Sequence, residues 1–169
     1  NSASQGAIRP SGTLRITTPS IFGIHHLDRA AVDYVQRNPG VQIDLSISER
    51  IVDLVDEGFD LAIRVSKAIA PGLVARRLAP ARIVAYAAPS YLRKRGTPKA
   101  PEDLAHHNCL FYSGTTYRNN WLFRRDGKET VVQVSGTMRA NNGDVLLNAA
   151  IEGLGVIYEP TFLVSEALR

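Results

Sequence analysis

The sequence predicts an α/β fold with two Rossmann-like lobes. Short apolar runs that suit strands alternate with amphipathic stretches that suit helices, once before about residue 80 and again after it. Successive strand–helix–strand steps imply parallel strands joined by right-handed crossovers. The 169 residues suffice for one domain or two small lobes. We therefore expect a flexible lead-in over residues 1–11, a first lobe over 12–80 and a second lobe over 81–169.

The first lobe begins with a strand and a helix. Leu14 and Ile16 alternate with polar residues, which predicts a strand over 12–18. Apolar residues at helical spacing follow until Asn38-Pro39-Gly40 ends the helix. Its expected inner face is Ile24, Leu27, Ala31, Tyr34 and Val35. Alternation over 41–47 predicts a second strand, and residues 48–57 a second, short helix.

The segment from Gly58 to Arg64 is the most informative of the chain. Gly58 suits the left-handed end of that second helix. Leu61, Ala62 and Ile63 form an unbroken apolar run, typical of a strand buried on both faces. Arg64 then places a charge at the strand's carboxyl end, where ligands of open α/β sheets bind. Arg64 is therefore either a surface charge paired with Asp60 or Glu57, or a residue that binds an anion.

The second lobe repeats the pattern with shorter elements. Asp126-Gly127 is a strong turn signal and predicts a hairpin. Proline near the first turn favours helices that begin at residues 89 and 101. An extended piece is expected over 73–78. The expected strands are 82–88, 109–112, 121–124, 129–134 and 154–158, and the expected helices are 89–95, 101–106, 142–152 and one that Glu159-Pro160 opens.

Composition excludes several classes of protein. The net charge of +4 comes from scattered basic residues, which favours solubility over a nucleic-acid surface. No helix-turn-helix or zinc-finger pattern occurs, and no apolar run approaches a membrane span. A single cysteine, Cys109, excludes an intrachain disulfide and agrees with a reducing cytoplasm.

We expect neither a metal site nor catalysis. The pairs His25-His26 and His106-His107 are adjacent residues, which point about 100° apart on a helix and do not chelate. Cys109 falls in an expected buried strand, where a thiol is inert. No catalytic triad spacing or glycine-rich phosphate loop is present, so we expect no cofactor.

Candidate ligand-binding residues follow the expected strands of both lobes. Thr18, Pro19, Ser20 and Ile21 lie where a helix begins, and free amides there favour an anion, although Thr18 or Ser20 would also serve as a simple cap. Ser48 follows the second strand, where capping is the favoured role. Candidates in the second lobe are Tyr112, Ser113 and Asn142, with capping or strand-end roles as the alternative, and Pro160, which opens the last helix.

A series of motifs spans nearly the whole chain. The strongest is Val52-Asp53-Leu54-Val55-Asp56-Glu57-Gly58-Phe59-Asp60-Leu61-Ala62-Ile63-Arg64. The others, in order, are Gly12-Thr13-Leu14-Arg15-Ile16, Arg37-Asn38-Pro39-Gly40-Val41, Ala88-Pro89-Ser90-Tyr91-Leu92, Gly96-Thr97-Pro98, Pro101-Glu102-Asp103-Leu104-Ala105, and Gly153-Leu154-Gly155-Val156 followed by Pro160. In this order they resemble the effector-binding domain of LysR-type transcriptional regulators. Asp28-Arg29 departs from the family, which often has an apolar residue and proline there.

The resemblance implies a fold like that of type 2 periplasmic binding proteins, with a small-molecule effector between the lobes. It implies that Arg64 and the turn after Thr18 face the effector, which we expect to be a carboxylate. It also implies a homo-oligomer in the cytoplasm, promoter DNA bound by a helix-turn-helix domain outside this sequence, and a first lobe completed by segments after Arg169. The alternatives are a solute-binding protein of a transport system and an enzyme on a related fold.

Overall fold

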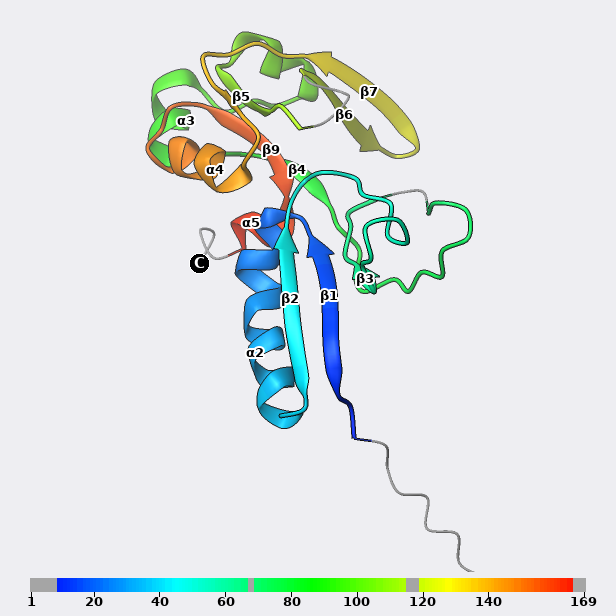
Figure 1. The fold of residues 1–169 in the computed structure, drawn as a ribbon. Coiled ribbons are helices and arrows are strands. Elements are labelled where there is room, and N and C mark those ends of the chain that lie inside the picture. Colours follow the sequence, from blue (N-terminus) through cyan, green and yellow to red (C-terminus); the bar gives the residue numbers. More distant parts are fainter. Residues whose placement is uncertain (1–8, 67–68, 115–118, 166–169) are drawn as a thin grey trace, which may run out of the picture. The chain divides into compact units, whose positions relative to one another are not determined.

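The computed structural model describes residues 9–66, 69–114 and 119–165, and its helices and strands fall into two units, Asn1–Leu73 and Val74–Arg169 (Figure 1). The predicted lead-in over 1–11 lies, up to residue 8, outside the described residues. So does the end of the predicted last helix, from residue 166.

The first unit is a parallel sheet of three strands in the order β2-β1-β3. Its strands are β1 (Gly12–Thr18), β2 (Val41–Ile47) and β3 (Leu61–Ala62). Three helical segments, α1 (Ser20–Phe22), η1 (Gly23–Leu27) and α2 (Asp28–Arg37), follow one another between β1 and β2. Helix α2 runs alongside β2 (Figure 1). This arrangement confirms the predicted first strand–helix–strand step with parallel strands.

The predicted helix over 48–57 is wrong. Turns replace it: Phe59 N–H donates to the Leu54 carbonyl at 2.8 Å, and the Asp53 carboxylate accepts from the amides of Val55 (2.9 Å) and Asp56 (3.0 Å). The apolar side chain of Val55, which should have faced a core, is 81% exposed. A short helix needs packing of its apolar face to be stable, and this segment lacks that packing.

The predicted burial of the third strand on both faces is also wrong. Strand β3 has two residues and, within the described part of the chain, pairs only with β1, through Ile16 opposite Leu61 and Thr17 opposite Ala62. Leu61 is 43% exposed because β3 is an edge strand. Gly58 does take the left-handed conformation, with a φ of 67°, although it ends a series of turns rather than a helix.

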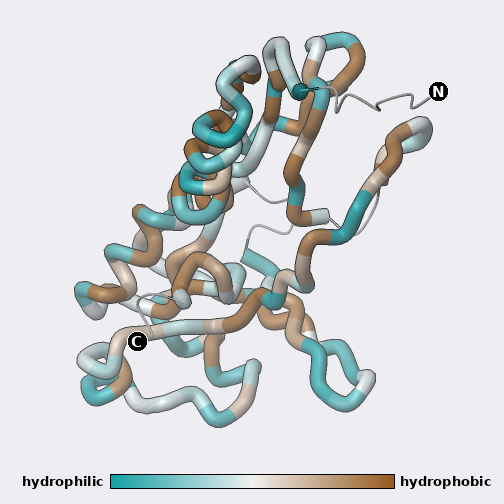
Figure 2. Tube along the Cα trace, turned by 90° about the horizontal axis from the view of Figure 1, so that it is seen from below, coloured by the Kyte–Doolittle hydropathy of each residue, from teal (hydrophilic) through white to brown (hydrophobic). Residues whose placement is uncertain are grey.

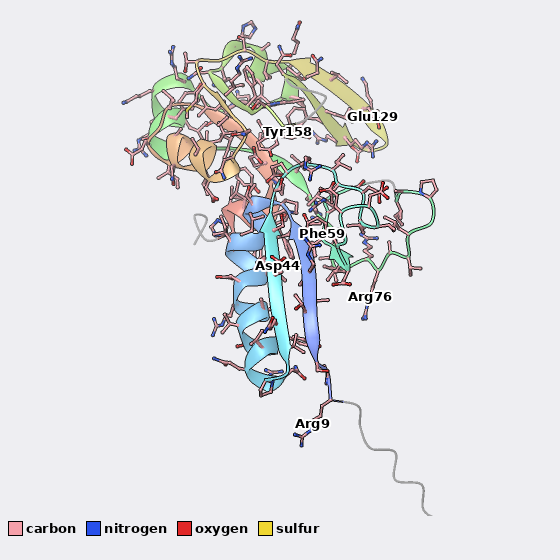
Figure 3. The ribbon with its side chains drawn as sticks, in the orientation of Figure 1. Arg9, Asp44, Phe59, Arg76, Glu129 and Tyr158 are labelled. Carbon is pink, nitrogen blue, oxygen red and sulfur yellow. The ribbon has the colours of Figure 1, made fainter. Side chains whose placement is uncertain are left out.

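Arg15 on β1 binds the turn segment, residues 53–60, to the sheet. Its guanidinium donates to the carbonyls of Glu57 (3.0 Å) and Gly58 (2.9 Å) and lies 5.1 Å from the ring centre of Phe59. On its other side it pairs with Asp44 of β2 at 3.3 Å; Asp44 and Phe59 are labelled in Figure 3. One arginine therefore links the segment before β3 to both β1 and β2.

The second unit contains a four-stranded sheet in the order β4-β9-β5-β8 and a separate hairpin. Its strands are β4 (Ile83–Ala87), β5 (Cys109–Tyr112), β6 (Asn120–Arg125), β7 (Lys128–Gln133), β8 (Arg139–Ala140) and β9 (Val156–Pro160), and its helices are α3 (Pro89–Arg95), the 3-10 helix η2 (Pro101–His106), α4 (Gly143–Ile151) and α5 (Thr161–Val164). Strands β5, β8 and β9 are mutually parallel, while β4 is antiparallel to β9. Strand β9 begins two residues later than predicted. Residues 73–78, predicted to be extended, belong to no strand, and the side chains of Val74 and Leu78 are exposed.

The second unit has a dense core. Leu110, Leu146 and Ile157 are fully buried, and a second cluster around Cys109, Trp121 and Val156 is equally closed. Along the chain, Figure 2 shows apolar segments that are short and repeatedly interrupted by polar ones. None of the helices in the described part of the chain is long and apolar enough to span a membrane.

Candidate functional site

The carboxyl ends of the three parallel strands meet at one edge of the first unit. The Ser48 amide after β2 donates to the Thr18 carbonyl at 2.9 Å, and the Ile63 amide after β3 donates to the Thr17 carbonyl at 2.9 Å. These bonds bring together the segments that carry the candidates Thr18, Ser48 and Arg64. The edge is where ligands of parallel α/β sheets bind.

Arg64 is held at this edge by neutral oxygen atoms. Its Nη2 donates to the Thr17 hydroxyl at 2.8 Å and to the Arg50 carbonyl at 3.2 Å, while Nη1 donates to the Ile63 carbonyl at 2.9 Å. The Thr17 side chain is fully buried, so the guanidinium rests against the interior of the sheet. Arg64 is therefore a fixed cation and not a free surface arginine.

Neither carboxylate expected as the alternative partner of Arg64 pairs with it. The Asp60 carboxylate accepts the Arg15 main-chain N–H at 2.9 Å. Glu57 is in a two-point contact with Arg50. Among the described residues, no ion pair includes Arg64.

Burial lowers the pKa of Arg64, and attraction to Glu49 raises it in part. An arginine stays protonated throughout the range in which proteins function. The positive charge at this edge is therefore permanent, and its electrostatic neighbour is Glu49.

Glu49 was missed by sequence reasoning. Its Oε1 accepts the main-chain N–H of Ser20 at 2.8 Å and the Ser20 hydroxyl at 2.6 Å. The amide of Ser20, expected to be free for a ligand, therefore already binds a carboxylate. The position of Glu49, next to the candidate Ser48 and after a strand, was the available signal.

The expected capping roles in the first unit are wrong. Pro19 occupies the N-cap of α1 and makes no side-chain cap. The Thr18 hydroxyl donates to the Pro19 carbonyl at 3.4 Å, and the Ser20 hydroxyl is taken by Glu49. Ser48 caps no helix, since none follows, and its hydroxyl accepts the Arg50 amide at 3.2 Å. Ile21 is 8% exposed, so only its main chain is available at this edge.

The four candidates of the second unit also lie at carboxyl ends of parallel strands. Tyr112 ends β5, Pro160 ends β9, and Asn142 follows β8 by two residues. The Ser113 amide donates to the Ala140 carbonyl at 2.8 Å, which fastens the end of β5 to β8. The edge thus gathers residues from three segments that are distant in sequence.

The structural roles expected for two of these residues are confirmed. The Asn142 Oδ1 accepts the Val145 amide at 3.2 Å and so caps α4. Pro160 is the N-cap residue of α5. Tyr112 is half-buried, and its ring lies against Gly114, where a Cβ atom would come within 2.4 Å of the ring.

Cys109 and the histidines form no reactive cluster. The Cys109 thiol is fully buried and donates to the Leu104 carbonyl at 3.4 Å, and burial raises its pKa to about 12. His107 Nδ1 lies 3.1 Å from the Tyr91 hydroxyl. Over residues 9–66, 69–114 and 119–165, no group of three or more metal-ligating side chains comes together.

Comparison with known proteins identifies the family. A family model of the LysR substrate binding domain matches residues 7–169. A probable HTH-type transcriptional regulator, LtrA of Klebsiella pneumoniae, is 36% identical over 157 residues, which are 93% of this chain and 51% of LtrA. The activator TtdR of Escherichia coli K12 is 30% identical over 150 residues, 88% of this chain and 48% of TtdR.

Solved structures agree with this family. CrgA, a LysR-type transcriptional regulator from Neisseria meningitidis, superimposes with a TM-score of 0.81 at 29% identity over 94% of this chain and 54% of CrgA. The Vibrio cholerae virulence activator AphB superimposes with a TM-score of 0.82 at 26% identity over 94% of this chain and 54% of AphB.

The chain spans about half the length of the relatives that it matches. Those relatives are named as transcriptional regulators, not as enzymes or transport proteins. The match covers both units and reaches the last residue. The chain belongs to the LysR family of transcriptional regulators and contains the substrate-binding domain of that family.

Proposed function

We propose that this chain is the effector-sensing part of a LysR-type regulator and that its effector is a small organic anion, with a carboxylate as the preferred group. The anionic group would bind at the carboxyl edge of the first unit, near Thr18, Pro19, Ser20, Ile21, Ser48 and Arg64. The candidates Tyr112, Ser113, Asn142 and Pro160 would contact the rest of the molecule from the carboxyl edge of the second unit.

The observation that carries the proposal is the environment of Arg64. Its hydrogen bonds are to a hydroxyl and two carbonyls, all uncharged. Such partners hold the guanidinium in position and carry no charge of their own, and the charge that acts on it is that of Glu49. A half-buried cation of this kind attracts an anion, and a hydrogen bond to a charged group contributes about 1.5–3 kcal/mol.

A thermal-shift screen of small carboxylates tests the proposal. A ligand at a hundredfold excess over its dissociation constant should stabilise the protein by about 2.7 kcal/mol. Arg64→Ala should abolish that stabilisation and Arg64→Lys should weaken it, because a lysine keeps the charge but loses the fork of donors. Arg93→Ala, at an exposed position on α3, is the matched control.

An equal response of the wild type and Arg64→Ala would contradict the assignment of Arg64. Failure of every carboxylate to stabilise the wild type would contradict the anion proposal itself. Circular dichroism of each variant separates loss of binding from loss of fold.

Effector binding would act on transcription through the rest of the regulator. We propose that promoter DNA is bound in the cytoplasm by a helix-turn-helix domain outside this chain, and that the protein forms a homo-oligomer. The effector would shift the packing of that oligomer, and it can do so only by its difference in affinity for the two arrangements. The names of the relatives, which are HTH-type regulators, support this part of the proposal.

A further inference from the structure

Glu49 occupies hydrogen-bond donors that a ligand carboxylate would need. The Ser20 amide and hydroxyl both donate to its Oε1, at 2.8 and 2.6 Å. Two donors converging on one oxygen are typical of a carboxylate-binding subsite. In this structure the carboxylate in that position belongs to the protein itself.

The same carboxylate is the electrostatic neighbour of Arg64. Attraction to Glu49 is the influence that opposes the effect of burial on Arg64. A positive and a negative charge therefore interact at this edge. A second carboxylate that arrived here while Glu49 stayed in place would meet like charge and no free donor on Ser20.

We infer that Glu49 is a specificity-determining residue of the effector site: its carboxylate fills the anion subsite on Ser20 in the effector-free protein, and the anionic group of the effector binds by displacing it. This inference rests on the proposed function, because it presupposes that an anion binds at this edge. It goes beyond that function by naming the group with which the effector competes.

The carboxylate of an effector can replace that of Glu49 without a rearrangement of the fold. Glu49 is exposed and lies in the segment after β2, which contains turns and no helix, so its side chain can rotate into water. One carboxylate replaces another, so the donors of Ser20 remain satisfied in both states. Nothing in the exchange requires the sheet to move.

Competition of this kind sets which anions bind. The apparent affinity falls by the fraction of molecules in which the subsite is open. A minimal carboxylate, with no other contacts, would be excluded at moderate concentration, whereas a larger molecule that also contacts the rest of the site would displace Glu49. The resident carboxylate therefore discriminates against small metabolic anions.

The test is a titration with acetate, monitored by the NMR signal of the Ser20 amide. We would compare the wild-type protein with Glu49→Ala, Glu49→Gln and the control Glu102→Gln, an exposed carboxylate on η2. An open state populated at 10% or less predicts that Glu49→Ala lowers the acetate concentration at half-saturation by at least about tenfold. Glu49→Gln keeps an acceptor oxygen but no charge, so its acetate concentration at half-saturation should lie between those of the wild type and Glu49→Ala. Glu102→Gln should match the wild type.

Three outcomes would overturn the inference and are distinguishable. If acetate binds at Ser20 with the same affinity in wild type and both Glu49 variants, an anion does bind there but Glu49 does not compete. If the Glu49 variants bind acetate more weakly, Glu49 assists recognition instead. If acetate shifts the Ser20 signal in neither the wild type nor any variant, both this inference and the proposal of an anionic effector fail. Spectra whose other signals stay in place show that each variant is folded.

Discussion

Both units have an edge at which parallel strands end, but different interactions stabilise the two edges. In the second unit, the segments that carry Tyr112, Asn142 and Pro160 extend from strands and a helix packed around fully buried Leu110, Leu146 and Ile157. In the first unit the turn segment before β3 is held mainly by polar contacts of arginines and carboxylates. Burial of apolar area stabilises without regard to direction, whereas polar contacts fix geometry and contribute less net free energy. The second edge is therefore held by apolar packing, and the first by polar contacts that contribute less net free energy.

The largest expected difference concerns leucine side chains. Leu146→Ala in the second unit removes a fully buried side chain and should lower the free energy of unfolding by about 2–5 kcal/mol. Leu61→Ala on β3, where the leucine is 43% exposed, should cost about 1 kcal/mol or less. Chemical denaturation of both variants measures the two values. Equal costs would contradict the difference in packing.

Two glycines provide a second, smaller contrast. A Cβ at Gly136 would lie 1.9 Å from the Cys109 carbonyl oxygen, which is main chain and cannot move aside. Gly136→Ala should therefore cost about 1–3 kcal/mol or more. At Gly23 of the first unit the nearest atoms belong to the side chains of Thr18 and Ile47, the closest at 2.8 Å. Gly23→Ala should be destabilising by less than Gly136→Ala, because the buried Thr18 side chain must shift but a gain of about 1 kcal/mol in helix propensity offsets part of that cost. A thermal melt of each variant would show the order, and a destabilisation by Gly23→Ala as large as that by Gly136→Ala would refute it.

The sequence predicted those elements whose signals are local. The hairpin around Asp126-Gly127, the helices that begin at residues 89 and 101, and the first strand–helix–strand step all follow from turn residues, prolines and periodicity. Arg64 and Ser48 were placed at one edge because parallel strands end together. These predictions needed no knowledge of packing partners.

The predictions that were wrong concern features that depend on tertiary contacts. The apolar spacing of Ile51, Leu54 and Val55 suits a helix, but that face finds no core and the segment forms turns instead. Glu49 could not be identified, because its role depends on which donors the segment after β1 brings within reach. Tertiary contacts decide such cases, and spacing alone does not.

A third contrast compares two arginines. Arg15→Ala in the first unit removes two hydrogen bonds to carbonyls, the pair with Asp44 and the contact with Phe59. We expect a loss of about 1–2 kcal/mol and faster hydrogen exchange over residues 53–60. Arg124→Ala in the hairpin removes a pair with Glu129 in which both side chains are more than half exposed, and should cost under about 1 kcal/mol. Faster exchange over residues 53–60 in Arg124→Ala, or none in Arg15→Ala, would count against polar fastening of that segment.

Near neutral pH the smallest effect on stability comes from the ionisation of Cys109, which changes the free energy of unfolding only at alkaline pH. Burial raises its pKa from the ordinary 9.0 to about 12, so near neutral pH the thiol is protonated in both folded and unfolded chains and contributes no pH dependence. Between pH 9 and 12 the unfolded chain would lose this proton while the folded chain keeps it, so stability should fall as pH rises through that range, and Cys109→Ala should lack this component.

At neutral pH the same burial makes Cys109 a reporter for the second unit. Iodoacetamide should label the native thiol slowly, because labelling requires an open, ionised thiol. With rising urea, labelling of Cys109 should begin at a higher concentration than proteolytic cleavage at residues 50–60 of the first unit. That order follows if apolar packing holds one edge and polar contacts hold the other. A single midpoint for both signals would mean that the two units unfold as one, and that the polar edge of the first is as firmly held as the packed edge of the second.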